Sequence, residues 1–115
     1  MRAYPKKLMS FFDWSQFLGK KDTKKLGNNT YVERIDSNTI GVRYHRTHVV
    51  QVRSDDTYRL TTNGWTTPTT KVRLNKYSPI NVWQKNFEWF YSHNGEDKSF
   101  YDGMIVDRAG NPVSV

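Results

Sequence analysis

Apolar residues follow two different spacings in this chain, a helical one near the start and an alternating one over the rest. Between Leu8 and Leu18 they recur three or four residues apart, which predicts a short amphipathic helix over about residues 6–18. Gly19 is a suitable end for that helix. Residues 19–29 are rich in Lys, Gly and Asn, so we expect them to form an exposed basic loop.

From Thr30 onward apolar and polar residues alternate, as they do in half-buried strands. The alternation predicts strands at residues 30–34, 39–45, 48–53, 57–62, 80–84 and 87–92. Turn-forming residues between these segments, including 93–96, indicate antiparallel hairpins. We expect residues 104–115 to form a closing hairpin with its turn at 107–111.

Residues 39–53 are compatible with one bent strand or with two strands. The apolar positions from Ile40 to Val52 stay in phase throughout, and Arg46-Thr47 is a poor two-residue turn. We therefore favour a single continuous strand with a bend or bulge at 45–48.

A second short helix is predicted at residues 68–77. Thr67 is suited to the N-cap position and Pro68 to the first helical position, because a proline there lacks only an N–H that would have no partner. Pro79 prevents the helix from continuing.

These elements predict an α+β, β-rich fold: a curled antiparallel sheet of about five to seven strands with one or two short helices packed on it. A chain of 115 residues has room for a single domain. We expect that domain to span residues 1–115, with the helix and basic loop in 1–29 and the β-rich core in 30–115.

The net charge of +7 is unevenly distributed. Residues 1–26 contain seven Lys and Arg against two acids, and residues 27–79 contain eight against four, whereas residues 80–115 contain three against five. This asymmetry favours an anionic partner such as nucleic acid, a nucleotide or an acidic protein surface. The alternative is that the charge only keeps an aromatic-rich protein soluble.

Several kinds of chemistry are disfavoured by the composition. With no cysteine, the chain has no disulfide, thiolate zinc site or cysteine nucleophile, and we expect it to work in a reducing cytoplasm. No apolar run resembles a signal peptide or a membrane span. His45 and His48 are too few for a metal site, and no catalytic set is evident from spacing. We therefore expect no cofactor and no metal, and an enzyme is not favoured.

Cationic side chains alternate along the central strands. If the apolar residues point inward, then Arg43, His45 and Arg59 point outward, and Arg34 and Arg53 are expected near the same surface. With Tyr44 and Tyr58 nearby, such a face suits phosphates and stacked bases. The alternative is an ordinary outer sheet face that is charged for solubility.

A second candidate site is the Thr-rich segment before the 68–77 helix. Hydroxyls and free N–H groups at a helix N-terminus favour anions. The candidate residues there are Trp65, Thr69, Thr70, Lys71 and Arg73. Capping by threonine alone is the simpler interpretation, since no phosphate-binding glycine motif is present.

A third candidate surface is aromatic and lies in the first predicted helix. Its members are Phe11, Phe12, Trp14 and Phe17, which would contact a protein partner if the helix exposes them.

Three blocks of sequence resemble a pattern found in small proteins of tailed bacteriophages: NNTYVER (28–34), IGVRYHRTHVV (40–50) and NGWTTPTTKVRLN (63–75). The resemblance implies a phage gene product in the bacterial host cytoplasm and no particular activity. Our leading hypothesis is a non-enzymatic accessory protein that binds nucleic acid or another polyanion. The alternatives are an inhibitor of a host protein, a protein that sequesters a signalling nucleotide and, less favoured, a small hydrolase.

Overall fold

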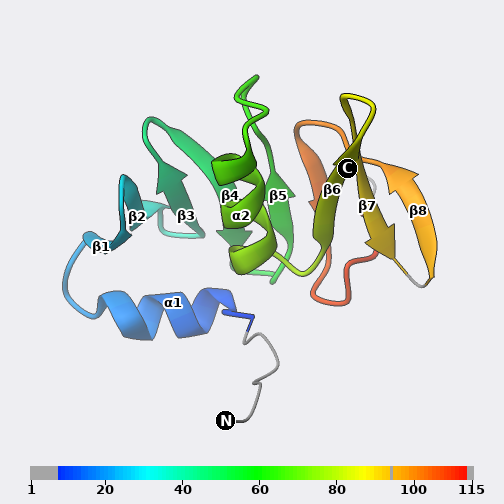
Figure 1. Ribbon diagram of the computed structural model, residues 1–115. Helices are drawn as coiled ribbons and strands as arrows, with labels where there is room; N and C mark the ends of the chain where they lie inside the picture. The colour runs from blue at the N-terminus through cyan, green and yellow to red at the C-terminus, as the bar shows by residue number, and fades with distance from the viewer. Residues whose placement is uncertain (1–7, 94, 114–115) are drawn as a thin grey trace, which may run out of the picture.

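The computed structural model describes residues 8–93 and 95–113. In this part of the chain, two helices and nine strands follow one another (Figure 1). Their bounds are α1 Phe11–Leu18, β1 Thr23–Gly27, β2 Thr30–Asp36, β3 Thr39–Tyr44, β4 Thr47–Arg53, β5 Tyr58–Leu60, α2 Pro68–Tyr77, β6 Asn81–Lys85, β7 Glu88–His93, β8 Glu96–Ser99 and β9 Met104–Val106.

The strands form two antiparallel sheets. The larger sheet has six strands in the order β1-β2-β3-β4-β5-β9, and the smaller has three in the order β6-β7-β8. Neither sheet closes into a barrel. The predicted α+β, β-rich class is confirmed, with the strands divided between two sheets. The strands predicted at 30–34, 48–53, 57–62, 80–84 and 87–92 are confirmed, with ends that differ by one or two residues.

The hydrophobic core lies between the larger sheet and the elements that cover one of its faces. Alternate residues of β2, β3 and β4, such as Val32, Val42 and Val50, point into it and are fully buried. In Figure 1, α2 crosses this face, α1 runs along one end of it and the smaller sheet lies beside α2. Leu74 of α2 and Val82 of β6 belong to the same buried cluster. The opposite face of the larger sheet carries mostly polar side chains.

Helix α1 is shorter than the predicted helix. Ser10 caps it, accepting a hydrogen bond from the Asp13 N–H while the Asp13 carboxylate accepts one from the Ser10 N–H. Residues 8–10 are therefore outside the helix, and residues 6–7 are not among the described ones. Trp14 and Leu18 are buried, whereas Phe12 is 67% exposed. The predicted helix at 68–77 is confirmed at Pro68–Tyr77, with Thr67 as its N-cap.

The prediction of a basic loop at 19–29 is wrong, because β1 lies there. β1 pairs with β2 as an edge strand, with Lys24 opposite Val32 and Lys25 opposite Tyr31. The Lys24 ammonium lies 4.6 Å from the centre of the Phe17 ring and donates to the Phe17 carbonyl at 2.7 Å. Lysine is common on edge strands, where its charge discourages pairing with another chain. A lysine-rich edge strand therefore has the polar composition that is typical of a loop.

The prediction of one continuous strand over 39–53 is also wrong. β3 and β4 are separate strands joined at His45-Arg46, and Tyr44 pairs with Thr47. The register shifts between Val42 and Arg43, which leaves one extra residue on β4. A two-residue turn alone would move the inward positions of β4 to odd-numbered residues, and the extra residue moves them back to Val50 and Val52. The apolar residues therefore have the same spacing in one bent strand as in this hairpin.

In the C-terminal third of the chain, the strands and their pairings differ from those predicted. β8 was not predicted as a strand, since all four of its residues are polar and exposed. β9 pairs with β5, more than forty positions earlier, and not only with the chain that follows it. The predicted turn at 107–111 is present: the Asp107 N–H donates to the Asn111 carbonyl and Val106 bridges to Pro112.

Candidate functional site

A cavity of about 910 Å³ opens at one end of the larger sheet, within the usual range for ligand pockets. Four segments meet there: the β1–β2 turn, the β3–β4 hairpin tip, the segment after β5 and the first turn of α2. Its lining residues are Asn29, Arg43, Tyr44, His45, Arg46, Thr47, Val49, Thr62, Asn63, Trp65, Thr67, Thr69 and Thr70. None of these is Asp or Glu, so the cavity favours anions.

The hairpin tip places two basic side chains at this cavity. His45 has a φ of +56°, a left-handed conformation that histidine adopts more readily than most residues. Its N–H donates to the Asn29 carbonyl at 2.8 Å, which ties the tip to the β1–β2 turn. Both His45 and Arg46 are exposed. The tip is thus held by its backbone while its side chains are available to a ligand.

The segment after β5 presents an aromatic ring. The Thr62 N–H and hydroxyl both donate to Asp102, at 2.8 and 2.9 Å, which anchors the start of the segment. Asn63 and Gly64 then take positive φ values of 51° and 84°, which turn the chain outward. Trp65 follows and is 65% exposed. The ring is therefore available for stacking at the rim of the cavity.

The first turn of α2 contributes hydroxyls. The Thr67 hydroxyl oxygen accepts from the Thr70 N–H, and it lies 3.1 and 3.0 Å from the hydroxyl oxygens of Thr69 and Thr70. The Tyr44 hydroxyl donates to the Thr69 hydroxyl at 2.9 Å. Thr69 is exposed and Thr67 half-buried, so their hydroxyls can donate to a ligand's oxygen atoms at the positive end of the helix dipole, whereas Thr70 is fully buried.

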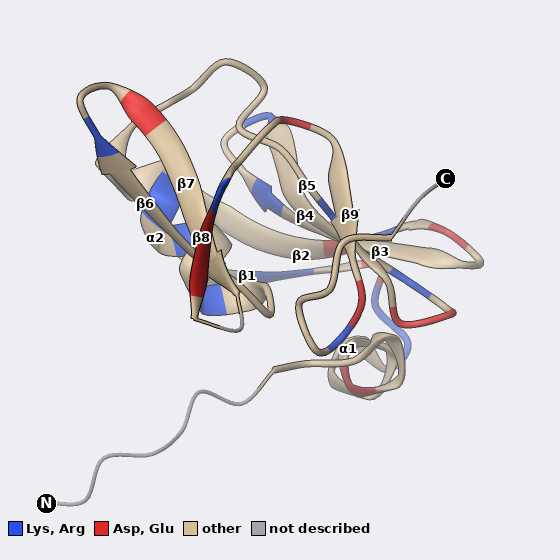
Figure 2. Cartoon of the chain, turned by 90° about the vertical axis from the view of Figure 1, so that its right-hand side faces the viewer, with Lys and Arg blue, Asp and Glu red and all other residues tan. Residues whose placement is uncertain are grey.

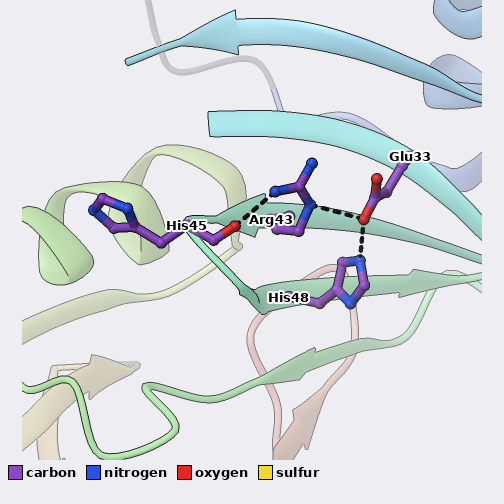
Figure 3. A network of polar contacts seen from close by, with 4 residues as sticks. All are labelled: Glu33, Arg43, His45 and His48. Atoms are coloured by element: carbon purple, nitrogen blue, oxygen red, sulfur yellow. Dashed lines mark hydrogen bonds and ion pairs between the residues drawn. The ribbon is translucent and has the colours of Figure 1, made fainter. Parts of the chain in front are cut away.

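Arg43 lies where the cavity meets the polar face of the larger sheet. Its Nε donates to Glu33 at 2.9 Å and its Nη1 donates to the His45 carbonyl at 2.6 Å. His48 Nε2 lies 2.7 Å from the same Glu33 oxygen, whereas the His45 ring points away from this network (Figure 3). Arg43 thereby fixes the hairpin tip, and at least two of its five N–H groups remain for a ligand.

Glu33 is held in its charged form. Burial raises the pKa of its carboxyl, but the hydrogen bonds from His48 and Arg43 and the positive charge of Arg43 outweigh this effect. The pKa therefore lies below its ordinary value of 4.5. A carboxyl whose pKa is lower in the folded state stabilises the fold above its ordinary pKa, and this contribution is lost as the pH falls through the lowered value.

Replacing Glu33 with glutamine should therefore destabilise the protein in a pH-dependent way. We expect Glu33→Gln to lower the free energy of unfolding by about 1 kcal/mol at about pH 7, because Arg43 and His48 lose a charged acceptor that is partly exposed. The difference from the unmodified protein should be smaller at about pH 3, because the contribution is lost as the pH falls through the lowered pKa of Glu33. Urea unfolding at both pH values measures it, with Glu96→Gln on exposed β8 as control. An equal difference at both pH values would contradict this assignment.

The cavity brings together five of the nine residues predicted to bind nucleic acid or phosphate: Arg43, His45, Trp65, Thr69 and Thr70. Arg34 lies elsewhere. It pairs with Ile40 on the core side of the sheet and donates to the Gly19 carbonyl at 2.8 Å, so the expectation that it shares a face with Arg43 is wrong. Arg59 is on the face of Arg43 but does not line the cavity.

Lys71 and Arg73 bind protein groups. The Lys71 ammonium donates to Gln84 at 3.3 Å. The Arg73 guanidinium stacks on Tyr44 at 4.5 Å and donates to the Thr30 hydroxyl at 3.1 Å. Arg73 therefore supports one wall of the cavity from behind, and an anion is not needed to explain either cation.

Sequence reasoning did not identify Arg46 and Asn29 as site residues. The predicted continuous strand over 39–53 gives no reason to expect Arg46 at a hairpin tip, where the structure has it. Asn29 and Asn63 have positive φ values of 52° and 51°, as asparagine commonly does in turns. The pairs Asn28-Asn29 and Asn63-Gly64 were the available signals for the two turns.

Only part of the aromatic surface predicted in the first helix is exposed. Trp14 is only 3% exposed and packs in the core, whereas Phe12 and Phe17 are exposed and Phe11 is half-buried.

Within residues 8–93 and 95–113, no three His, Asp or Glu side chains are grouped to hold a metal. Neither described helix is long and apolar enough to cross a membrane.

Residues 14–107 match the family model described as Kyanoviridae Gp96 protein. That match covers the larger sheet, α2, the part of α1 from Trp14 onward and every segment that lines the cavity. No curated protein and no solved structure matches the chain.

Proposed function

The chain belongs to the Kyanoviridae Gp96 protein family, and we propose that this phage protein binds single-stranded nucleic acid at the cavity without catalysing a reaction. One observation carries the proposal: the cavity joins two arginines, a histidine, threonine hydroxyls and an exposed tryptophan, with no carboxylate in its lining. Proteins that bind single strands combine a positive groove with aromatic stacking in this way.

Each group has a distinct role in the proposal. His45 and Arg46 contact phosphates from the hairpin tip, and Trp65 stacks on a base across the cavity. The hydroxyls of Thr67 and Thr69 at the start of α2 donate to phosphate or sugar oxygens. A single strand fits this arrangement because its bases are free to leave one another and stack on protein rings.

Salt dependence is the first test. We expect a labelled oligo(dT) of about ten nucleotides to bind with an affinity that falls between about 25 and 300 mM NaCl, with a log–log slope of roughly −0.7 per phosphate contact. Arg46→Ser should reduce that slope by roughly one such contact. Fluorescence anisotropy at several salt concentrations measures both.

Lys85→Ser is the matched control for this experiment, since Lys85 is an exposed cation on β6 that does not line the cavity. The Lys85→Ser variant should show the same log–log salt slope as the unmodified protein. Absence of binding at low salt, or equal loss of slope in both variants, would refute the proposal.

A signalling nucleotide is an alternative ligand for the same cavity, because the volume of the cavity also suits a small ligand. Competition separates the two ligands. A cyclic dinucleotide that displaces the oligonucleotide and binds more tightly than it does would favour sequestration of a nucleotide.

A protein partner is the second candidate function, and Phe87 favours it. This residue stands at the tip of the β6–β7 hairpin with 94% of its surface exposed. Its φ of +67° is costly for a bulky side chain, so a glycine would be preferred there for folding alone. Exposed rings of this kind anchor protein interfaces. Capture of a defined host protein after nuclease treatment, lost in Phe87→Ser, would support this role.

A further inference from the structure

A row of side chains crosses the polar face of the larger sheet and ends at the cavity. In the register of the sheet, Lys25 of β1 lies opposite Tyr31 of β2, Tyr31 opposite Arg43 of β3, and Arg43 opposite His48 of β4. Directly paired residues project from the same face, so these four side chains stand side by side across four strands. Three strand spacings separate the ends of the row, about 14 Å.

This face is not covered by the elements that form the core. α1 and α2 both pack on the opposite face, as shown by the contacts of Lys24 with Phe17 and of Tyr44 with Thr69. Lys25 is exposed, while Tyr31, Arg43 and His48 are half-buried among their neighbours. The face is therefore open to a ligand that lies flat across the strands.

The chemistry of the row suits a phosphate backbone. The Arg43 guanidinium lies 4.7 Å from the centre of the Tyr31 ring, a stacked pair that leaves N–H groups at its edge. Arg59 adds positive charge on the same face, and Arg53 lies there close to the charge of Asp55. Acidic residues lie on β8, whose Glu96 and Asp97 segment is red in Figure 2, and around the β4–β5 turn, away from the row. Glu33 is the acid beside the row, and it is already bound by Arg43 and His48.

Arg43 belongs to both surfaces, since it also lines the cavity. We infer that a single strand bound in the cavity leaves it past Arg43 and crosses the polar face over Tyr31 to Lys25, perpendicular to the strands. This inference rests on the proposed function and makes the ligand a polymer, not a free nucleotide. The cavity binds a few nucleotides, and the row binds the backbone that follows them.

The dependence on oligonucleotide length tests this path. We expect Lys25→Ser to weaken binding of an oligo(dT) of about twelve nucleotides by roughly 3- to 10-fold and to reduce its salt slope by roughly one phosphate contact. The same variant should leave binding of a trinucleotide unchanged. Lys25→Glu, which reverses the charge on this exposed edge strand, should weaken the longer ligand further. Circular dichroism verifies that both variants are folded.

Two controls make the result specific. Lys85→Ser on β6 should bind both ligands like the unmodified protein, and Trp65→Ala should weaken both. If Lys25→Ser and Lys25→Glu bind the longer oligonucleotide normally while Trp65→Ala does not, the path across the sheet is overturned and the cavity stands. If neither oligonucleotide binds the unmodified protein, the proposed function fails, and the path fails with it.

Discussion

Replacing Trp14 with alanine is expected to lower the free energy of unfolding by about 3–5 kcal/mol, because the indole fills the space between α1 and the larger sheet. Trp14 is 3% exposed, and its ring lies 5.8 Å from Phe17 and 6.0 Å from Tyr77 of α2. Removing it opens a cavity where both helices meet the sheet. Urea unfolding at about 25 °C measures the loss, which is a large share of the roughly 5–15 kcal/mol typical of a small protein.

Two variants in the same helix test whether packing is the cause. Phe12→Ser should change stability by less than about 0.5 kcal/mol, because Phe12 is 67% exposed. Trp14→Phe should lose much less than the alanine variant. It keeps most of the ring, and it removes an indole N–H that is buried without a hydrogen-bond partner among the described residues. A larger loss for Phe12→Ser than for Trp14→Ala would contradict this packing of α1.

Replacing Trp65 with alanine is expected to weaken binding of single-stranded oligonucleotides by roughly 5- to 150-fold, the range that corresponds to loss of one base stack. Trp65 is 65% exposed and stands outside the core, so the free energy of unfolding should change by less than about 0.5 kcal/mol. Anisotropy titration and urea unfolding of the same preparation separate the two effects. The salt slope should stay unchanged, since stacking displaces no counterions.

Phe87→Ala is the matched control, because it removes an aromatic ring that is even more exposed but lies away from the cavity. It should bind oligonucleotides like the unmodified protein. Trp65→Phe should recover part of the lost affinity, as a smaller ring still stacks. Equal binding by the Trp65→Ala variant would place any nucleic-acid site elsewhere on the molecule.

Local signals in the sequence predicted the elements whose causes are local. The helix at Pro68–Tyr77 follows from Thr67 as cap and Pro68 at the first position, which act within one turn. The strands follow from alternation, because one face of the larger sheet is buried and the other is polar. β1 and β8 escaped prediction because edge strands with polar residues carry no such contrast.

The candidate site was only partly predictable, since five of its residues were identified without a reason to place them together. Arg43 and Trp65 are more than twenty positions apart, and their proximity depends on the β3–β4 turn and on the course of the chain after β5. Arg34 was expected near the surface of Arg43 because it is close to a hairpin, yet it lies on the opposite face of the sheet, in phase with buried Val32. The prediction of one continuous strand over 39–53 failed for another reason. The two-residue turn and the extra residue on β4 together keep the apolar positions in phase, so the phase does not reveal the turn.

The sequence by itself determined the helices, most strands, the β-rich class and the resemblance to a phage family, because these properties reside in neighbouring residues or in motifs. Tertiary structure alone decided which cations share a surface and which are occupied by the protein itself. A side chain's partners depend on strand register and on loop conformation, and neither is encoded in spacing along the chain. For this reason only the fold places Arg46 at the cavity and Lys25 in the row across the polar face, and only the fold shows that Arg34 and Arg73 bind groups of the protein itself.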